Sequence, residues 1–218
     1  MPEKQNISSL VISYLSLRKA VGVIGISLPF VLVFGKIILE SPGILDSVSS
    51  YYYSVMRDVF VGSLCAIGVF LFSYHGYERE DDIAAKIASI SAIGVALFPI
   101  APETAATAQQ VMIGKWHLFF ALILFLTLAY FALVLFRKTD PHQSPTPMKR
   151  VRNVIYAVCG SLILFCIAAI IFLTFVPPVQ WIPIIPHSIF WLEALAIISF
   201  GISWLIKGEA ILQDQGSS

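Results

Sequence analysis

The chain has 218 residues and a formal net charge of +1, with 58% hydrophobic and only 12% charged residues. A soluble domain carries about 25% charged residues, so this chain has too few polar groups to cover the surface of a soluble monomer. Its basic residues lie at the ends of apolar runs and form no extended basic face, which excludes nucleic acid as a partner. The composition predicts an integral membrane protein.

The three cysteines, Cys65, Cys159 and Cys166, all fall inside apolar runs. An odd number of thiols is not a disulfide framework, and each is expected to be a small core residue. The sequence contains no CxxC or HExxH motif and no phosphate-binding loop, and it leaves the cofactor unidentified. Residues 1–17 lack the pattern of a cleaved signal, so the first helix is expected to be a retained anchor.

Six apolar runs are each about long enough to cross a bilayer, which takes about 20 mostly apolar residues in a helix. The runs are continuous and do not alternate, so they predict helices and exclude a β-barrel. The predicted fold class is therefore all-α, a polytopic membrane protein with one domain, residues 1–218, and six transmembrane helices. The predicted spans are 20–39, 58–77, 83–101, 116–136, 154–176 and 188–206.

The third run, 83–101, is the least typical of the six. It is short, it contains Lys86 near its start, and it meets Pro99 and Pro102 at its end. If this run alone did not cross the membrane, every later helix would run in the opposite direction.

Basic residues fall almost entirely on one side of this six-span arrangement. Only Lys36, Arg57 and Lys115 fall on the other side. An excess of Lys and Arg marks the cytoplasmic side, so both termini are predicted to be cytoplasmic and the protein to be a multi-pass protein of a bacterial inner (plasma) membrane. The eleven residues on the predicted cytoplasmic side are Lys4, Arg18, Lys19, Arg79, Lys86, Arg137, Lys138, Lys149, Arg150, Arg152 and Lys207.

Glu193 is the strongest candidate for a functional residue. It lies six residues after His187 in an otherwise uncharged run, about 9 Å into the helix at 1.5 Å per residue. An ionisable side chain at the centre of a span costs about 2.5–3.5 kcal/mol on insertion scales, and such residues tend to mark function. Two interpretations remain open: a proton-coupling or ligand-binding site, and a hydrogen-bonded link between two helices.

A second group of polar residues lies at the start of the second span. Asp58 in the first turn of a helix favours the positive end of the helix dipole, and Arg57 and Tyr52 are both typical of a membrane interface. Each residue alone has this ordinary explanation. Together with Ser49 and Ser50, however, they place many hydrogen-bonding groups at one helix mouth, so Tyr52, Arg57 and Asp58 are candidate ligand-binding or proton-coupling residues.

His117 and His187 lie at the outer mouths of the fourth and sixth predicted spans. The topology places both histidines on the same side of the membrane as Asp58 and Glu193, so four candidate groups from three helices are expected to converge there. If a metal ion is bound, His117, His187 and Asp58 are its predicted ligands.

Several short motifs distributed over nearly the whole chain resemble a group of bacterial multi-pass integral membrane proteins of unknown function. The resemblance carries no activity, but it implies that Asp58 and Glu193 belong to a shared motif. The motifs are Ser50-Tyr51-Tyr52-Tyr53, Arg57-Asp58-Val59-Phe60-Val61-Gly62, Gly76-Tyr77, Val95-Ala96-Leu97-Phe98-Pro99, Phe190-Trp191-Leu192-Glu193-Ala194 and Gly201-Ile202-Ser203-Trp204.

A more distant resemblance is to the CREST superfamily of membrane hydrolases and receptors. Members have seven helices and hold a metal ion with several histidines, a serine and an aspartate near one membrane face. The resemblance implies that Ser49 or Ser50, Asp58, His117 and His187 would form such a site. The chain departs from the pattern because it lacks the seventh helix and an HxxxH-type pair.

These observations leave three functional hypotheses. The first is a protein with an outer-side polar cavity that binds, senses or transports a small molecule or lipid. The second is a structural or assembly protein in which the acidic residues serve only packing. The third is a metal-dependent lipid hydrolase, in which zinc would lower the pKa of bound water. The lipid bilayer is the expected partner in all three, with assembly into a homo-oligomer as a further hypothesis.

Overall fold

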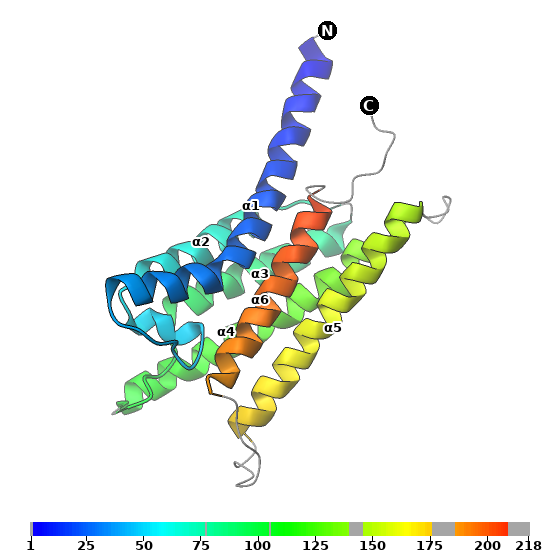
Figure 1. Cartoon of the computed structure of the whole chain (residues 1–218). Helices are drawn as coiled ribbons and strands as arrows, with labels where there is room; N and C mark the ends of the chain where they lie inside the picture. Colours follow the sequence, from blue (N-terminus) through cyan, green and yellow to red (C-terminus); the bar gives the residue numbers. More distant parts are fainter. Residues whose placement is uncertain (1, 77, 105, 140–145, 176–185, 209–218) are drawn as a thin grey trace.

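The computed structural model of the chain describes residues 2–76, 78–104, 106–139, 146–175 and 186–208, and the side chains from residue 15 onward (Figure 1). Within these ranges the chain is helical and contains no strand. The all-α fold class is confirmed. The elements are α1 (Pro2–Leu39), η1 (Ser49–Tyr53), α2 (Arg57–Phe72), α3 (Arg79–Leu97), α4 (Ala108–Leu133), η2 (Leu135–Arg137), α5 (Pro147–Phe175) and α6 (Ser188–Lys207).

In the part of the chain that the structure describes, four helices are long and apolar enough to cross a membrane, where six were predicted. They span Leu15–Leu39, Ala108–Arg137, Pro147–Phe175 and Ser188–Lys207. α2 is apolar but has 16 residues, which at 1.5 Å each gives about 24 Å, against about 30 Å for the hydrocarbon core. α3 has 19 residues, but its first turn is the charged sequence Arg79-Glu80-Asp81-Asp82.

The observed helices are longer than several of the predicted spans. α1 begins at Pro2, α4 at Ala108 and α5 at Pro147. The predicted span 188–206 coincides with α6 to within one residue. The predicted ends at residues 77 and 176 lie outside the described residues.

Local sequence explains two of the observed helix starts. Glu78 and Asp81 form a reciprocal capping box at the start of α3, and Thr107 and Gln110 form one at the start of α4. Each box satisfies two backbone N–H groups that would otherwise have no intrahelical partner. α4 therefore begins in a polar turn, before the apolar run starts.

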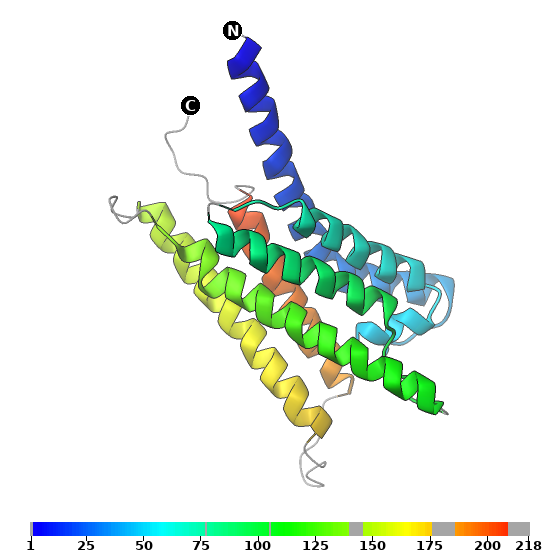
Figure 2. The same ribbon diagram turned by 180° about the vertical axis from the view of Figure 1, so that it is seen from behind.

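Successive helices run in opposite directions, and α6 lies between α1 and α5. α1 and α5 pack against opposite sides of α6, and α4 packs against α5 (Figures 1 and 2). α2 and α3 form an antiparallel pair beside α1 and α4. Half of the α6 span is buried inside the protein, compared with a third of the α4 and α5 spans. A residue on α6 is therefore the best placed to contact several helices at once.

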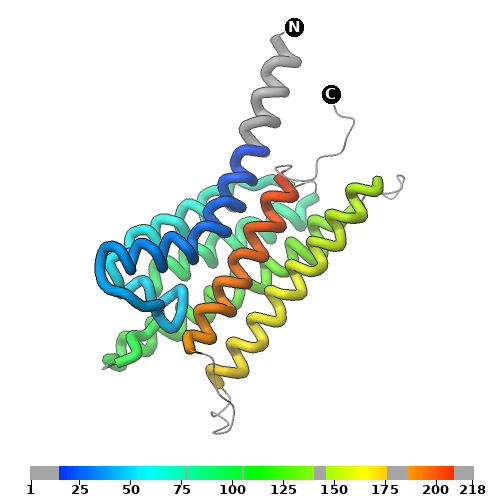
Figure 3. The backbone as a smooth tube through the Cα atoms, in the orientation of Figure 1, coloured from blue at the N-terminus to red at the C-terminus, as the bar shows by residue number. Residues whose placement is uncertain are grey.

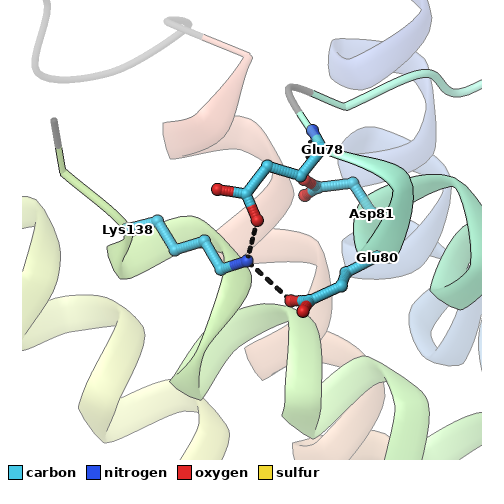
Figure 4. Close-up of polar contacts among 4 residues, drawn as sticks. All are labelled: Glu78, Glu80, Asp81 and Lys138. Atoms are coloured by element: carbon cyan, nitrogen blue, oxygen red, sulfur yellow. Dashed lines mark hydrogen bonds and ion pairs between the residues drawn. The ribbon is translucent and has the colours of Figure 1, made fainter.

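The bundle has two ends with different side chains. At the basic end, the start of the α1 span meets the end of α6, and the turn between α2 and α3 meets the end of α4 (Figure 3). There Lys138 forms ion pairs with Glu78 at 2.6 Å and Glu80 at 2.7 Å (Figure 4). At the opposite end, here called the Glu193 end, the loops around η1 and before α4 meet the start of α6.

An aromatic cluster fills the core near the basic end. Its centre is Trp204 of α6, which is 1% exposed and contacts the rings of four residues, one each from α4, η2, α6 and the segment after α2. Its ring centroid lies 5.1–5.8 Å from those of Tyr74, Phe131, Phe136 and Phe200. Aromatic pairs at this separation stabilise a core beyond the burial of their area.

Candidate functional site

Glu193 lies in the second turn of α6, and its carboxylate binds the backbone of η1. Its Oε2 accepts hydrogen bonds from the N–H groups of Val48 at 2.6 Å and Ser49 at 3.3 Å. The Phe190 N–H donates to the carbonyl of Asp46 at 2.9 Å in the same region. Glu193 therefore joins α6 to the N-terminal end of a short helix 145 residues earlier in the chain. Of its two sequence-based interpretations, this geometry matches the hydrogen-bonded link.

Glu193 is half-buried, and it lines two cavities. The inner cavity has a volume of about 50 Å³ and is enclosed by residues of α1, η1, α2, α3, α4 and α6. A water needs about 10–15 Å³ of such volume, so the cavity has room for a few waters beside Ser49 and Glu193. Ala121, Phe125 and Glu193 line both cavities and so lie between them.

The outer cavity is the larger of the two, with a volume of about 270 Å³. It is a partly open groove between α4 and α5, in the half of those helices nearer the Glu193 end, and Glu193 lines it from α6. Most of its lining is aliphatic or aromatic, and the polar members are His117, Thr174 and Glu193. The groove is here called the α4–α5 groove, and it is lined by His117, Leu118, Phe119, Ala121, Leu122, Phe125, Ile167, Ile170, Ile171, Thr174, Phe175 and Glu193.

His117 is 2% exposed and joins α4 to the end of α3. Its Nδ1 lies 2.7 Å from the carbonyl oxygen of Phe98, the residue that ends α3. A carbonyl oxygen can only accept, so Nδ1 carries the proton and donates. In the neutral imidazole, Nε2 is then an acceptor.

His187 contacts a residue that the sequence did not single out. Its Nδ1 lies 2.7 Å from Oδ1 of Asp46 in the loop between α1 and η1. His187 precedes α6 in a left-handed conformation, with φ of 58°. Burial, together with the negative charge of Asp46, raises the pKa of Glu103 in the loop before α4. Asp46, Glu103 and His187 therefore form a second polar group at the Glu193 end.

The structure brings together some of the predicted site residues and separates others. The Arg57 guanidinium lies 4.6 Å from the centre of the Tyr52 ring and donates to its hydroxyl at 3.0 Å. Asp58 is exposed in the first turn of α2. Among the described residues, no hydrogen bond or ion pair joins Asp58 to His117, His187 or Glu193.

The predicted metal ligands are not assembled into a site. In the part of the chain that the structure describes, no three His, Cys, Asp or Glu side chains lie close enough together to hold a metal ion. His117 is bonded to the end of α3, and His187 to Asp46. What the structure does bring together is Glu193 and His117, from two helices, in the wall of one groove.

Sequence reasoning missed the backbone partners of Glu193 and the residues Asp46 and Glu103. Backbone N–H groups in a loop leave no residue-type signal. Asp46 and Glu103 lie in polar loops of the chain, where acidic residues are ordinary.

No protein family model matches the chain, and no curated protein and no solved structure matches it either.

Proposed function

We propose that this protein binds an amphipathic, lipid-like molecule within the membrane. The apolar part of the ligand lies in the α4–α5 groove, and its polar group meets Glu193 and His117. The observation that carries the proposal is the groove itself, about 270 Å³ in volume, with two ionisable side chains from different helices in an otherwise apolar wall. Ligand sites are typically concave and mostly apolar, with a few polar groups that fix orientation.

The hydrogen bonds of the wall define the headgroup. The carboxylate of Glu193 is an acceptor, and His117 offers an acceptor when Nδ1 donates to Phe98. A ligand that satisfies both groups must supply donors, because acceptors facing acceptors would leave buried polar groups unpaired. The proposed ligand class is therefore a long-chain molecule with a hydroxyl or amine headgroup, and long-chain carboxylates are disfavoured.

The membrane setting belongs to the same proposal. The chain crosses a bacterial inner membrane with both termini in the cytoplasm, and the groove opens in the outer half of the bilayer. The concentration of Lys and Arg at the basic end supports this orientation. In that arrangement a ligand reaches the groove from the outer leaflet, between α4 and α5, without passing through the core.

Photolabelling of the full-length protein in nanodiscs tests this function. The probes are a diazirine-bearing long-chain amine and the diazirine-bearing methyl ester of the same chain length, which has no donor. We expect the amine to label peptides of α4 and α5 and the ester to label them about tenfold less, the ratio that corresponds to about 1.4 kcal/mol. Equal labelling by both probes would contradict the proposal that the headgroup of the ligand is a hydrogen-bond donor.

A matched pair of variants tests the position of the ligand. Ile170→Trp fills the groove, whereas Leu164→Trp adds the same side chain to an exposed position of α5 outside its lining. We expect Ile170→Trp to abolish labelling by the amine and Leu164→Trp to leave it unchanged. Labelling that persists in a folded Ile170→Trp protein contradicts the proposal.

A structural role is the second candidate function, and one observation favours it. Both hydrogen bonds of Oε2 of Glu193 go to the backbone of Val48 and Ser49, which is a packing function. If neither probe labels the groove, the protein is better described as a structural or assembly component. Replacement of Glu193 would then change stability alone.

A further inference from the structure

A second groove lies between α3 and α4, in the half of those helices nearer the basic end. The two helices lie side by side and run antiparallel (Figure 2). The groove has a volume of about 330 Å³, within the range of about 300–1,000 Å³ that is typical of ligand sites. It is here called the α3–α4 groove, and it is lined by Glu80, Ile83, Ala84 and Ile87 of α3 and by Leu126, Thr127 and Tyr130 of α4.

Two walls and a floor give this groove its shape. The four lining residues of α3 follow the spacing i, i+3, i+4 and i+7, so they lie on one face of the helix. Ile83 and Ile87 are exposed on that face, whereas Ala84 between them is 5% exposed. Leu126 and Tyr130 of α4 are one helical turn apart and are also exposed. The small side chain of Ala84 therefore forms the floor between two pairs of larger side chains.

The ionisable groups of the α3–α4 groove lie at one of its ends. Glu80 is in the first turn of α3 and Tyr130 is in the last turn of α4, so the antiparallel packing brings both to the basic end. The hydroxyl of Thr127 donates to the carbonyl oxygen of Ile123 at 2.7 Å and is therefore already paired. The rest of the lining is aliphatic. A molecule that fits this groove is therefore polar where the helices end and apolar farther in.

The polar end of the groove carries more negative than positive charge. The Lys138 ammonium lies between two carboxylates, 2.6 Å from Oε2 of Glu78 and 2.7 Å from Oε2 of Glu80 (Figure 4). These three groups keep a net negative charge at neutral pH, and the first turn of α3, Arg79-Glu80-Asp81-Asp82, is itself acidic. The Glu80 side chain is 61% exposed, and a carboxylate can accept several hydrogen bonds. Glu80 can therefore accept from a cation at the mouth of the groove while it stays paired with Lys138.

We propose that the α3–α4 groove binds a phospholipid with a primary ammonium in its headgroup, the chemistry of phosphatidylethanolamine. The hydrocarbon lies against Ile83, Ile87 and Leu126, and the ammonium donates to Glu80. A primary ammonium makes charge-assisted hydrogen bonds to a carboxylate, whereas the trimethylated ammonium of phosphatidylcholine has no N–H group to donate. Lys138 supplies a positive charge for the lipid phosphate beside the same carboxylate. The proposal rests on the membrane setting of the proposed function but not on its ligand.

Native mass spectrometry of the full-length protein, released from nanodiscs, tests this site. The nanodiscs contain phosphatidylcholine mixed in equal parts with phosphatidylethanolamine or with phosphatidylglycerol. We expect wild type to retain phosphatidylethanolamine about tenfold more than phosphatidylcholine, the effect of one additional charge-assisted hydrogen bond. Equal retention of these two lipids, or stronger retention of the anionic phosphatidylglycerol than of phosphatidylethanolamine, would overturn the proposal.

A matched pair of carboxylate variants makes the test specific to the groove. Glu78 and Glu80 both pair with Lys138, but Glu80 lines the groove and Glu78 is outside its lining. We expect Glu80→Gln to reduce the tenfold preference for phosphatidylethanolamine to near parity. Glu78→Gln keeps an acceptor oxygen for the capping box of α3 and should retain the preference. Equal losses in the two variants would show attraction by surface charge in general and contradict the site.

A second matched pair tests the apolar part of the site. Ile87→Trp fills the α3–α4 groove, whereas Ile90→Trp adds the same side chain at an exposed position of α3 outside the lining. We expect Ile87→Trp to abolish the preference for phosphatidylethanolamine and Ile90→Trp to leave it unchanged. A preference that persists in a folded Ile87→Trp protein contradicts the proposal. These positions lie outside the lining of the α4–α5 groove, so photolabelling of that groove and lipid retention at this one fail independently.

Discussion

Gly22 of α1 and Gly201 of α6 bring the backbones of their helices into direct contact. A Cβ on Gly201 would lie 2.7 Å from the carbonyl oxygen of Gly22, and a Cβ on Gly22 would lie 2.9 Å from the carbonyl oxygen of Gly201. Small residues allow such close approach between helices in a membrane, where van der Waals packing replaces the hydrophobic effect as the driving force. The contact fixes α1 against α6.

Gly201→Ala should destabilise the protein by about 1–3 kcal/mol, the usual cost of overpacking. The atoms that its methyl group would meet include backbone atoms of Gly22 and Ile26, which cannot move aside as a flexible side chain can. Unfolding in mixed detergent micelles measures the change. The control is Gly62→Ala in α2, where nothing lies within 4 Å of the new Cβ. It should stabilise the protein by up to about 1 kcal/mol through helix propensity.

Glu193→Ala should lower the free energy of unfolding by about 3 kcal/mol, because the N–H groups of Val48 and Ser49 lose their charged hydrogen-bond acceptor. Glu193→Gln keeps an acceptor oxygen in the same position and should cost about 1 kcal/mol. The same unfolding measurement compares them. Equal losses in the two variants would show that the negative charge matters and the hydrogen bonds do not.

Glu103→Gln should make the protein more stable at neutral pH. Burial and the charge of Asp46 raise the pKa of Glu103 above its ordinary value of 4.5. The folded state then holds the proton more tightly than the unfolded state, so stability is greatest below pH 4.5 and falls as pH rises through the folded pKa. Thermal unfolding should be recorded between about pH 4 and about pH 8, the range in which a raised carboxyl pKa falls. The unfolding temperature should decline less with rising pH in the variant than in wild type. An unchanged pH profile would exclude this contribution.

Lys138→Gln should lower stability at low ionic strength only. The carboxylates of Glu78 and Glu80 raise the pKa of Lys138, so its favourable contribution is present at neutral pH and is lost when pH rises through the folded pKa. All three side chains are solvent-accessible, so salt should screen the interaction. Lys86→Gln, at an exposed position of α3, is the control and should show no salt-dependent difference. A difference that persists at high salt would contradict this explanation.

Much of the fold could be predicted because apolar runs are a long-range signal that needs no tertiary information. α6 was predicted to within one residue because an uncharged run fills it completely. The start of α4 was missed because Thr107 and Gln110 cap a polar turn, and hydropathy does not register capping. The predicted spans 58–77 and 83–101 are not confirmed, because α2 has only 16 residues and α3 begins with a charged turn.

The candidate site was less predictable, for a physical reason. Sequence singled out Glu193 because an ionisable group inside an apolar helix is costly and therefore conspicuous, and His117 because it lies at the outer mouth of a predicted span. It could not identify their partners, since Val48, Ser49 and Phe98 act through backbone atoms that every residue shares. Asp58 was singled out together with Tyr52 and Arg57 as a polar group at one helix mouth, and it lies exposed at a helix start, where an acidic residue is ordinary.

The antiparallel pairing of α2 and α3 has a consequence for the whole chain. The two helices enter the bundle from the Glu193 end and return to it, so together they add an even number of crossings, whether each goes right through or both turn back partway. The number of crossings contributed by this pair is even in both cases, so α1 and α6 keep the same relative direction however deep the hairpin reaches. Reporters fused to the two termini would give identical signals in either case, and only a tag in the connection between α2 and α3 could register how far the hairpin reaches.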